Sequence, residues 1–361
     1  MVFSEVFSED HLRPQPMRRY PELDGLRAIA IALVVLYHLK PFIPESHGLL
    51  RAVFGTGWNG VYLFFVLSGF LIGTLAFSET DRTDSLDVQR FWMRRILRTW
   101  PLYFVLLPVN YLRALDNGLS ISPPIWQYLT FTQNLSEVHF FGPTWSLAVE
   151  EQFYFVLPLV VLGVVRSSVR TRWAVGLVVA GLLAPWIARM AQGLGSQLWI
   201  VMDSLVVGIA VGLLKRYRPE AFARTTRWPN LLFLAGVVAV YAPFVLTDGT
   251  RVREVVILGG QAVGFGLVMM AALSGRLALR SALSSRPAYF VALTSYSIYL
   301  THGDPVFWVG RWATQATLSP TVQSGVVVAG GLLGSVVVGA ILYYLVERPG
   351  MRIRDRYFPR R

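Results

Sequence analysis

A cation and a titratable base share one apolar segment near the start of the sequence. Arg27 and His38 are separated by ten residues, nearly all of them apolar. In a helix, eleven positions advance about 16 Å and return to within about 20° of the starting direction, so both side chains point the same way at different depths. A charge and an imidazole inside a hydrophobic span are costly unless they face a protein interior or a wet cavity. The pair therefore indicates a functional site.

A carboxylate is predicted at the outer end of another span. If Thr144 caps a helix, Glu150 lies about 9 Å below the mouth of that helix. Tyr154 follows at i+4 on the same face, whereas Glu151 is rotated by about 100° and should point elsewhere. A carboxylate at this depth can orient an imidazole and stabilise its protonated form, as in hydrolytic triads. We therefore expect Glu150 to be catalytic and Tyr154 to support it.

A second imidazole, His302, falls in the outer half of a later span. We expect His38, Glu150 and His302 to meet near the outer face, where a histidine can take a proton from a hydroxyl and return it. Asp203, near the outer end of a further span, and Asn134, in the longest external loop, are weaker members of this set. The loop itself is either a lid or acceptor platform or a plain connector. No metal site is expected.

Arg95 and Arg98 lie at i and i+3 on one helix face. The planar fork of arginine suits phosphate oxygens, so these residues, together with Arg27, are expected to hold a phosphate-rich cofactor that approaches from the cytoplasm. The alternative is that they only anchor the helix at the membrane surface. Ser68 and Gly69 in the second span indicate close helix packing rather than a site.

The composition predicts helices that would position these residues in a membrane. Of 361 residues, 54% are hydrophobic and 15% are charged, and the mean hydropathy is +0.50. Apolar runs of roughly twenty residues are long enough to cross a bilayer as helices. We therefore predict an all-α, polytopic membrane protein. Its ten spans are expected at about residues 24–43, 58–77, 99–116, 145–165, 173–190, 198–214, 229–246, 254–274, 288–308 and 322–346.

The charge pattern orients the spans. The formal net charge is +12, and most arginines gather in alternate loops, which is typical of positive-inside topology rather than of nucleic-acid binding. Both termini are then cytoplasmic. The predicted divisions are a tail at 1–23 with no signal peptide, a transmembrane domain at 24–346 and a basic tail at 347–361. Because the chain has no cysteine, thiol chemistry is excluded.

Five ordered segments resemble the acyltransferase-3 family of bacterial integral-membrane O-acyltransferases. They read LDGLRAIAIALVVLYH, GVYLFFVLSGFLI, RRILRTWPLY, TWSLAVEEQFY and YSIYLTH. The Arg-x10-His motif of the family maps onto Arg27 and His38, its Arg-x-x-Arg motif onto Arg95 and Arg98, and its glutamate onto Glu150. The chain departs from the family in two places: Tyr62 stands where Asp is frequent, and Val201-Met202-Asp203 replaces Arg-x-Asp.

The resemblance implies a multi-pass protein of the bacterial cytoplasmic (inner) membrane. Its donor would be cytoplasmic acyl-CoA, most simply acetyl-CoA. Its acceptor would be a hydroxyl of an extracytoplasmic carbohydrate, lipid-linked glycan or metabolite. A stand-alone transferase without an SGNH hydrolase-like domain is expected. His38 would either deprotonate the acceptor or carry the acyl group transiently.

Two other classes of protein remain open. A transporter or flippase would also place buried charges along its path. A non-catalytic membrane scaffold would tolerate replacement of His38.

Overall fold

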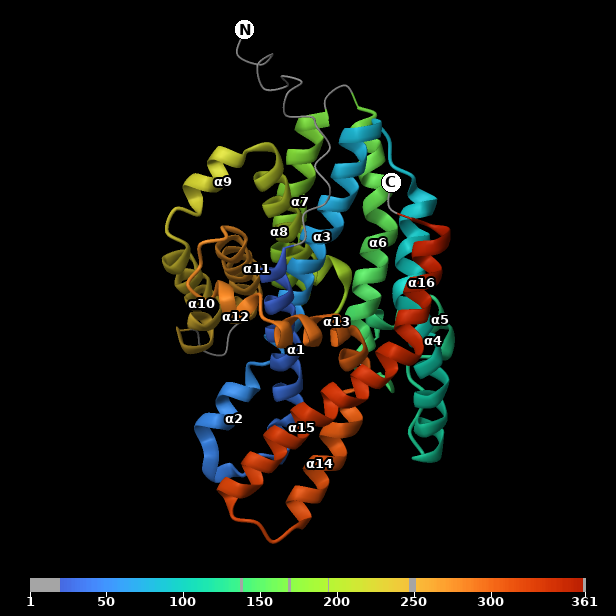
Figure 1. Ribbon diagram of the computed structural model, residues 1–361, viewed down its shortest axis with the longest axis vertical. Helices are drawn as coiled ribbons and strands as arrows, with labels where there is room; N and C mark the ends of the chain where they lie inside the picture. Colours follow the sequence, from blue (N-terminus) through green and yellow to red (C-terminus); the bar gives the residue numbers. More distant parts are fainter. Residues whose placement is uncertain (1–19, 137–138, 168–169, 194, 247–250, 360–361) are drawn as a thin grey trace.

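The computed structural model describes residues 20–136, 139–167, 170–193, 195–246 and 251–359. Within these ranges the chain consists of helices and connecting segments, without a β-strand (Figure 1). The elements are α1 (Pro21–Leu39), η3 (Lys40–Phe42), η4 (Glu45–His47), α2 (Gly48–Gly55), α3 (Asn59–Thr83), α4 (Val88–Asp116), α5 (Ile125–Leu129), η5 (Gln133–Leu135), α6 (Thr144–Val165), α7 (Arg170–Gln192), α8 (Leu198–Tyr217), α9 (Pro219–Thr225), α10 (Pro229–Leu246), α11 (Arg251–Leu273), α12 (Arg280–Leu283), α13 (Arg286–Thr301), α14 (Gly303–Gln315), α15 (Pro320–Leu342), the π-helical turn η6 (Tyr343–Glu347) and α16 (Arg348–Tyr357).

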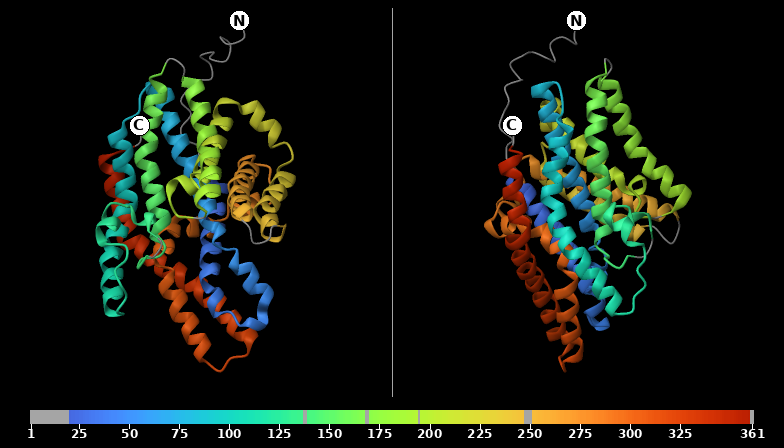
Figure 2. Two further views of the ribbon diagram at one scale, coloured as in Figure 1. Left: turned by 180° about the vertical axis from the view of Figure 1, so that it is seen from behind. Right: turned by 90° about the vertical axis from the view of Figure 1, so that its right-hand side faces the viewer.

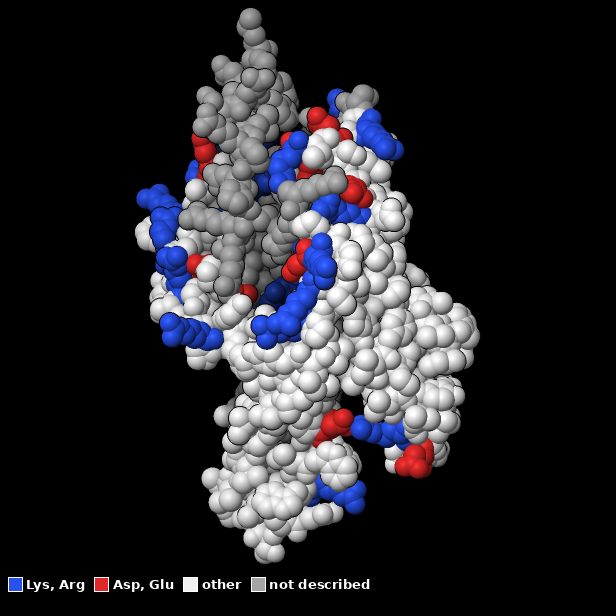
Figure 3. Space-filling view, turned by 45° about the vertical axis from the view of Figure 1, so that its right-hand side comes forward, with Lys and Arg blue, Asp and Glu red and all other residues white. Residues whose placement is uncertain are grey.

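The prediction of an all-α polytopic membrane protein is confirmed. In the described residues, seven helices are long and apolar enough to cross a membrane. Large apolar side chains such as Ile187 and Leu333 are two-thirds exposed, as expected for surfaces that face lipid. Figure 3 shows Lys and Arg gathered at one end of the molecule, with a broad uncharged band below them.

One predicted span is interrupted. The segment expected at 288–308 breaks at His302, where α13 ends and α14 begins. Each of the two helices is shorter than a full span. The helix α4 meets the expected span at 99–116 but starts earlier, and it contains Pro101 and Pro108. The segment predicted as a basic C-terminal tail is helical as α16.

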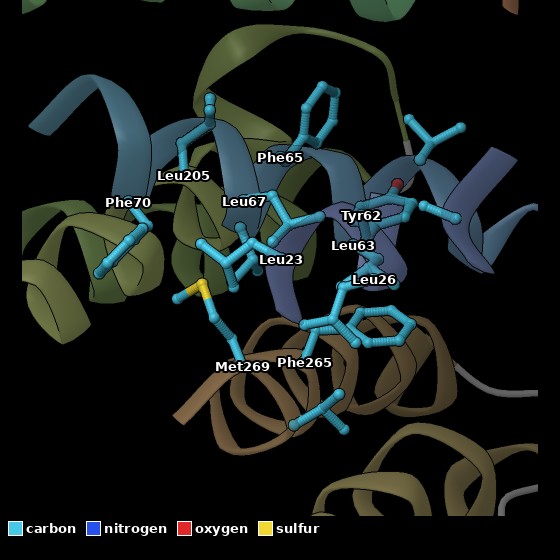
Figure 4. Packing of buried hydrophobic residues seen from close by; sticks show 14 of the residues in the cluster. Leu23, Leu26, Tyr62, Leu63, Phe65, Leu67, Phe70, Leu205, Phe265 and Met269 are labelled. Carbon is cyan, nitrogen blue, oxygen red and sulfur yellow. The ribbon is translucent and has the colours of Figure 1, made fainter. Parts of the chain in front are cut away.

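Close packing of α3 on α8 forms the centre of the molecule. A Cβ atom at Gly69 would lie 1.9 Å from the carbonyl oxygen of Leu205, and one at Gly208 would lie 2.1 Å from that of Val66. Only glycine allows the two backbones to approach so closely, so the predicted role of Gly69 is confirmed. Figure 4 shows the core around this contact, in which side chains of α1, α3, α8 and α11 interdigitate.

The helix α1 connects two parts of the molecule. It packs against α3 and α13 in the main bundle and against α14 and α15 further along. Figures 1 and 2 show that α2, α14 and the first half of α15 form a lobe that extends beyond the end of α6. The second half of α1 enters this lobe. Residues in the first half of α1 therefore lie in the main bundle, and residues near its end lie beyond it.

Candidate active site

A cavity of about 110 Å³, partly open to the surface, lies among α1, α3, α4, α6 and α13. Its polar lining consists of Arg27, Ser68, Arg95, Arg98, Thr99, Ser146, Glu150, Tyr154, Ser295, Tyr296 and Tyr299. The structure thus brings together the three arginines, the glutamate and the tyrosine that the sequence singled out. The remaining lining is apolar and comes mainly from α3.

The three arginines face the cavity, and carboxylates lie near two of them: Asp24 and Glu150 near Arg27, and Glu347 near Arg98. Within the described part of the chain, no group accepts a hydrogen bond from the guanidinium of Arg27, Arg95 or Arg98. Arg95 stacks over the ring of Tyr154, with its Cζ atom 5.6 Å from the centroid. The three half-buried guanidiniums repel one another across one cavity and donate no hydrogen bond to the described residues, so this cluster is suited to an anionic ligand.

Glu150 organises hydroxyl groups inside the cavity. Its carboxylate lies within hydrogen-bonding reach of the hydroxyls of Ser68 and Tyr154, which are also bonded to each other. Glu151 points elsewhere, as predicted: it is buried and accepts hydrogen bonds from Thr99 Oγ1 at 2.8 Å and Trp100 Nε1 at 3.1 Å. Helix α6 begins at Thr144, with Pro143 as its N-cap. The hydroxyl of Thr144 donates to the Phe141 carbonyl, so Thr144 does not cap the helix as the sequence suggested.

Ser68 lines the cavity, which its sequence context did not indicate. Gly69 and Gly73 face α8, and Ser68 is rotated by about 100° from Gly69 onto another face of α3. Once the small residues are assigned to the α8 contact, the neighbouring serine must point away from it. That spacing was the available signal.

The two histidines form a separate centre. His302 Nε2 lies 3.3 Å from His38 Nδ1, and the rings pack edge to face with centroids 4.7 Å apart. His302 is completely buried, whereas His38 is exposed. Neither residue lines the cavity. The expected meeting of the histidines is therefore found, but without Glu150, which lies with the arginines instead.

The hydrogen bonds define the tautomers of the neutral pair. His302 Nδ1 lies 2.7 Å from the Tyr299 carbonyl and His38 Nδ1 lies 2.8 Å from the Val34 carbonyl. A carbonyl only accepts, so both Nδ1 atoms carry the proton. The single Nδ1–H of His38 is then shared between the Val34 carbonyl at 2.8 Å and His302 Nε2 at 3.3 Å. This leaves the lone pair of His38 Nε2 as the proton acceptor of the pair.

Tyr299 connects the two centres. Its hydroxyl lies 2.6 Å from Ser146 Oγ at the cavity, and its carbonyl holds His302. Its ring lies 6.0 Å from that of His302. The sequence did not indicate this residue.

Asp203 and Asn134 lie outside the cavity. Asp203 is buried and paired with Arg189 Nη2 at 2.7 Å. Asn134 is buried and exchanges hydrogen bonds with Gln152 on α6, and its carbonyl accepts from Ser196 Oγ at 2.7 Å. Asn134 therefore fastens the external loop to α6 and to the α7–α8 connection.

The chain is similar to known proteins over most of its length. The family described as "Acyltransferase domain" matches residues 20–344. O-acetyltransferase OatA of Staphylococcus aureus strain NCTC 8325 is 26% identical over 337 residues, which cover 83% of this chain and 53% of that protein. A protein of S. aureus strain COL named "Putative O-acetyltransferase SACOL0978" is 28% identical over 264 residues, which cover 65% of this chain and 42% of that protein. The chain spans about half the length of these relatives.

Proposed function

We propose that this chain, which belongs to the acyltransferase-3 family, is a membrane O-acyltransferase that uses cytoplasmic acyl-CoA, most simply acetyl-CoA. The acceptor is a hydroxyl of an extracytoplasmic carbohydrate, lipid-linked glycan or metabolite, and the membrane is the bacterial cytoplasmic membrane. The observation that carries the proposal is the cluster of Arg27, Arg95 and Arg98 around one cavity, whose guanidiniums donate no hydrogen bond to the described residues.

The arginines bind the phosphates of the donor. Guanidinium groups form charge-assisted, often bidentate hydrogen bonds with phosphate oxygens. The cavity is lined closely by side chains of five helices, which suits a linear thioester arm better than a nucleotide. The nucleotide therefore stays at the arginine end while the arm extends along α6. Glu150, Ser68 and Tyr154 lie beside this arm and orient it through hydrogen bonds.

The histidine pair activates the acceptor. His38 Nε2 takes the proton of the acceptor hydroxyl, and the oxygen attacks the thioester carbonyl carbon. The carbon–sulfur bond breaks, and the CoA thiolate leaves and takes up the proton that His38 Nε2 carries, which restores the neutral histidine. The Val34 carbonyl and His302 Nε2 stabilise the imidazolium by sharing the Nδ1–H of His38. The same lone pair also allows the second route, in which His38 Nε2 carries the acyl group before the acceptor takes it.

Purified protein in liposomes with labelled acetyl-CoA and candidate glycans tests the proposal. Wild type should release CoA and label the acceptor, and His38→Ala and Glu150→Ala should lose most of this activity. Movement of an acceptor across the bilayer without CoA release would favour a transporter. Full activity of His38→Ala would remove His38 from the reaction.

A further inference from the structure

The cavity has two ends, defined by one face of α6. Ser146, Glu150 and Tyr154 follow one another at i, i+4 and i+8, so the first and last lie about 12 Å apart along the helix. Tyr154 marks one end, where Arg95 stacks on its ring. Ser146 marks the other end, where its hydroxyl meets that of Tyr299.

Three helices hold Tyr299 across the second end. Its hydroxyl is bonded to Ser146 on α6 at 2.6 Å, and its ring packs edge to face against Phe64 of α3 at 6.2 Å. Its carbonyl is fixed on the α13 side by His302. The phenol is therefore a rigid wall between the cavity and the histidine pair.

We infer that Tyr299 is a specificity-determining residue that restricts the donor to short acyl groups. The inference rests on the proposed function. The phosphates of the donor remain at the arginines, so the acyl group is the part of the arm that reaches furthest along the cavity. It stops against the phenol of Tyr299, beside His302. A longer chain meets the ring before its thioester reaches the same position.

The test measures the selectivity between two donors. Purified protein in nanodiscs is assayed with acetyl-CoA and butyryl-CoA, and the dissociation constants of the unreactive thioethers S-ethyl-CoA and S-butyl-CoA are measured in parallel. Wild type should prefer the shorter member of each pair. In Tyr299→Val the preference should shift toward the longer member by about fifteenfold, which corresponds to the burial of two additional methylene groups. Tyr299→Phe retains the ring and should keep the wild-type preference.

Tyr296→Val is the matched control. Tyr296 lines the same cavity on the same helix, but its hydroxyl donates to the carbonyl of Thr99, next to Arg98, at 2.6 Å. This substitution opens the arginine end, so the ratio between the two donors should stay at the wild-type value whatever happens to overall affinity.

Three results would overturn the inference. They are equal use of both donors by wild type, an unchanged ratio in Tyr299→Val, and an equal shift in Tyr296→Val. If Tyr299→Val is inactive, the dissociation constants of the two thioethers still decide the test, because the thioethers bind without reacting. Failure of wild type to bind either thioether or to release CoA would instead refute the proposed function itself.

Discussion

Replacement of Arg95 by alanine should weaken donor binding far more than it affects the chemical step. Arg95 faces the cavity, and its contact with protein is the ring of Tyr154 at 5.6 Å. Loss of that contact costs about 1 kcal/mol of stability. Loss of a charge-assisted hydrogen bond to phosphate costs about 1.5 to 3 kcal/mol of binding free energy. The KM for acetyl-CoA should therefore rise by roughly tenfold to 150-fold.

The assay follows CoA release from labelled acetyl-CoA by protein in nanodiscs, over a range of donor concentrations and with saturating acceptor. The value of kcat should change by only a few fold, because Arg95 is at the end of the cavity remote from the histidines. The same measurement on Arg98→Ala and on the double variant shows whether the two guanidiniums act on one group. The two residues are coupled if the change in binding free energy in the double variant differs from the sum of the changes in the single variants.

Arg94→Ala provides the control. Arg94 precedes Arg95 on α4, but it is turned toward the C-terminal segment, where it donates to the carbonyl of Phe358 and lies 3.6 Å from Asp355. It contributes the same charge to the positive-inside pattern. A wild-type KM in Arg95→Ala, or an equal rise in Arg94→Ala, would show that the arginines only anchor α4 in the membrane.

Three further predictions concern the residues around the cavity. His38→Ala should reduce kcat by about 10²- to 10⁴-fold. His302→Ala should reduce kcat less, because the base His38 is still present and only its orientation is lost. The KM for the donor should stay near the wild-type value in both variants, and equal kcat values would contradict the assigned roles. Glu150→Gln should raise KM for acetyl-CoA several fold more than it lowers kcat, because its contacts are with Ser68 and Tyr154 rather than with the histidines; the reverse pattern would place it at the reacting atoms. Arg189→Met should lower the free energy of unfolding by about 3 to 5 kcal/mol, because it leaves Asp203 unpaired. The double variant Arg189→Met with Asp203→Leu should recover much of this lost stability. Thermal unfolding in detergent measures both effects.

Local spacing predicted what single helices determine. Periodicity on α6 correctly placed Glu150 and Tyr154 on one face and turned Glu151 away. The i and i+3 spacing of Arg95 and Arg98 likewise put both guanidiniums into one cavity. These conclusions require only the geometry of a helix, which the apolar pattern identifies reliably in a membrane chain.

Relations between helices could not be obtained in this way. Hydropathy gives the ends of each span but not how far one helix extends past another. Because the outer half of α1 runs into the lobe formed with α14 and α15, His38 lies beyond the mouth of α6, and Glu150 meets Arg27 instead. The partner of Asp203 is also tertiary. Val201 stands where the family pattern has arginine, and the guanidinium comes from Arg189 on α7.

The arrangement of the two centres on shared helices limits what has to move during a reaction. Helix α1 carries Arg27 at the cavity and His38 at the outer pair, about 16 Å apart along its axis. Tyr299 lies near the end of α13, three residues before His302 at the break before α14. Rigid helices therefore fix the distance between the arginines and the imidazoles, as effective catalytic sites require. The phenol of Tyr299 stands between these centres, where its contacts with Ser146 and Phe64 hold it.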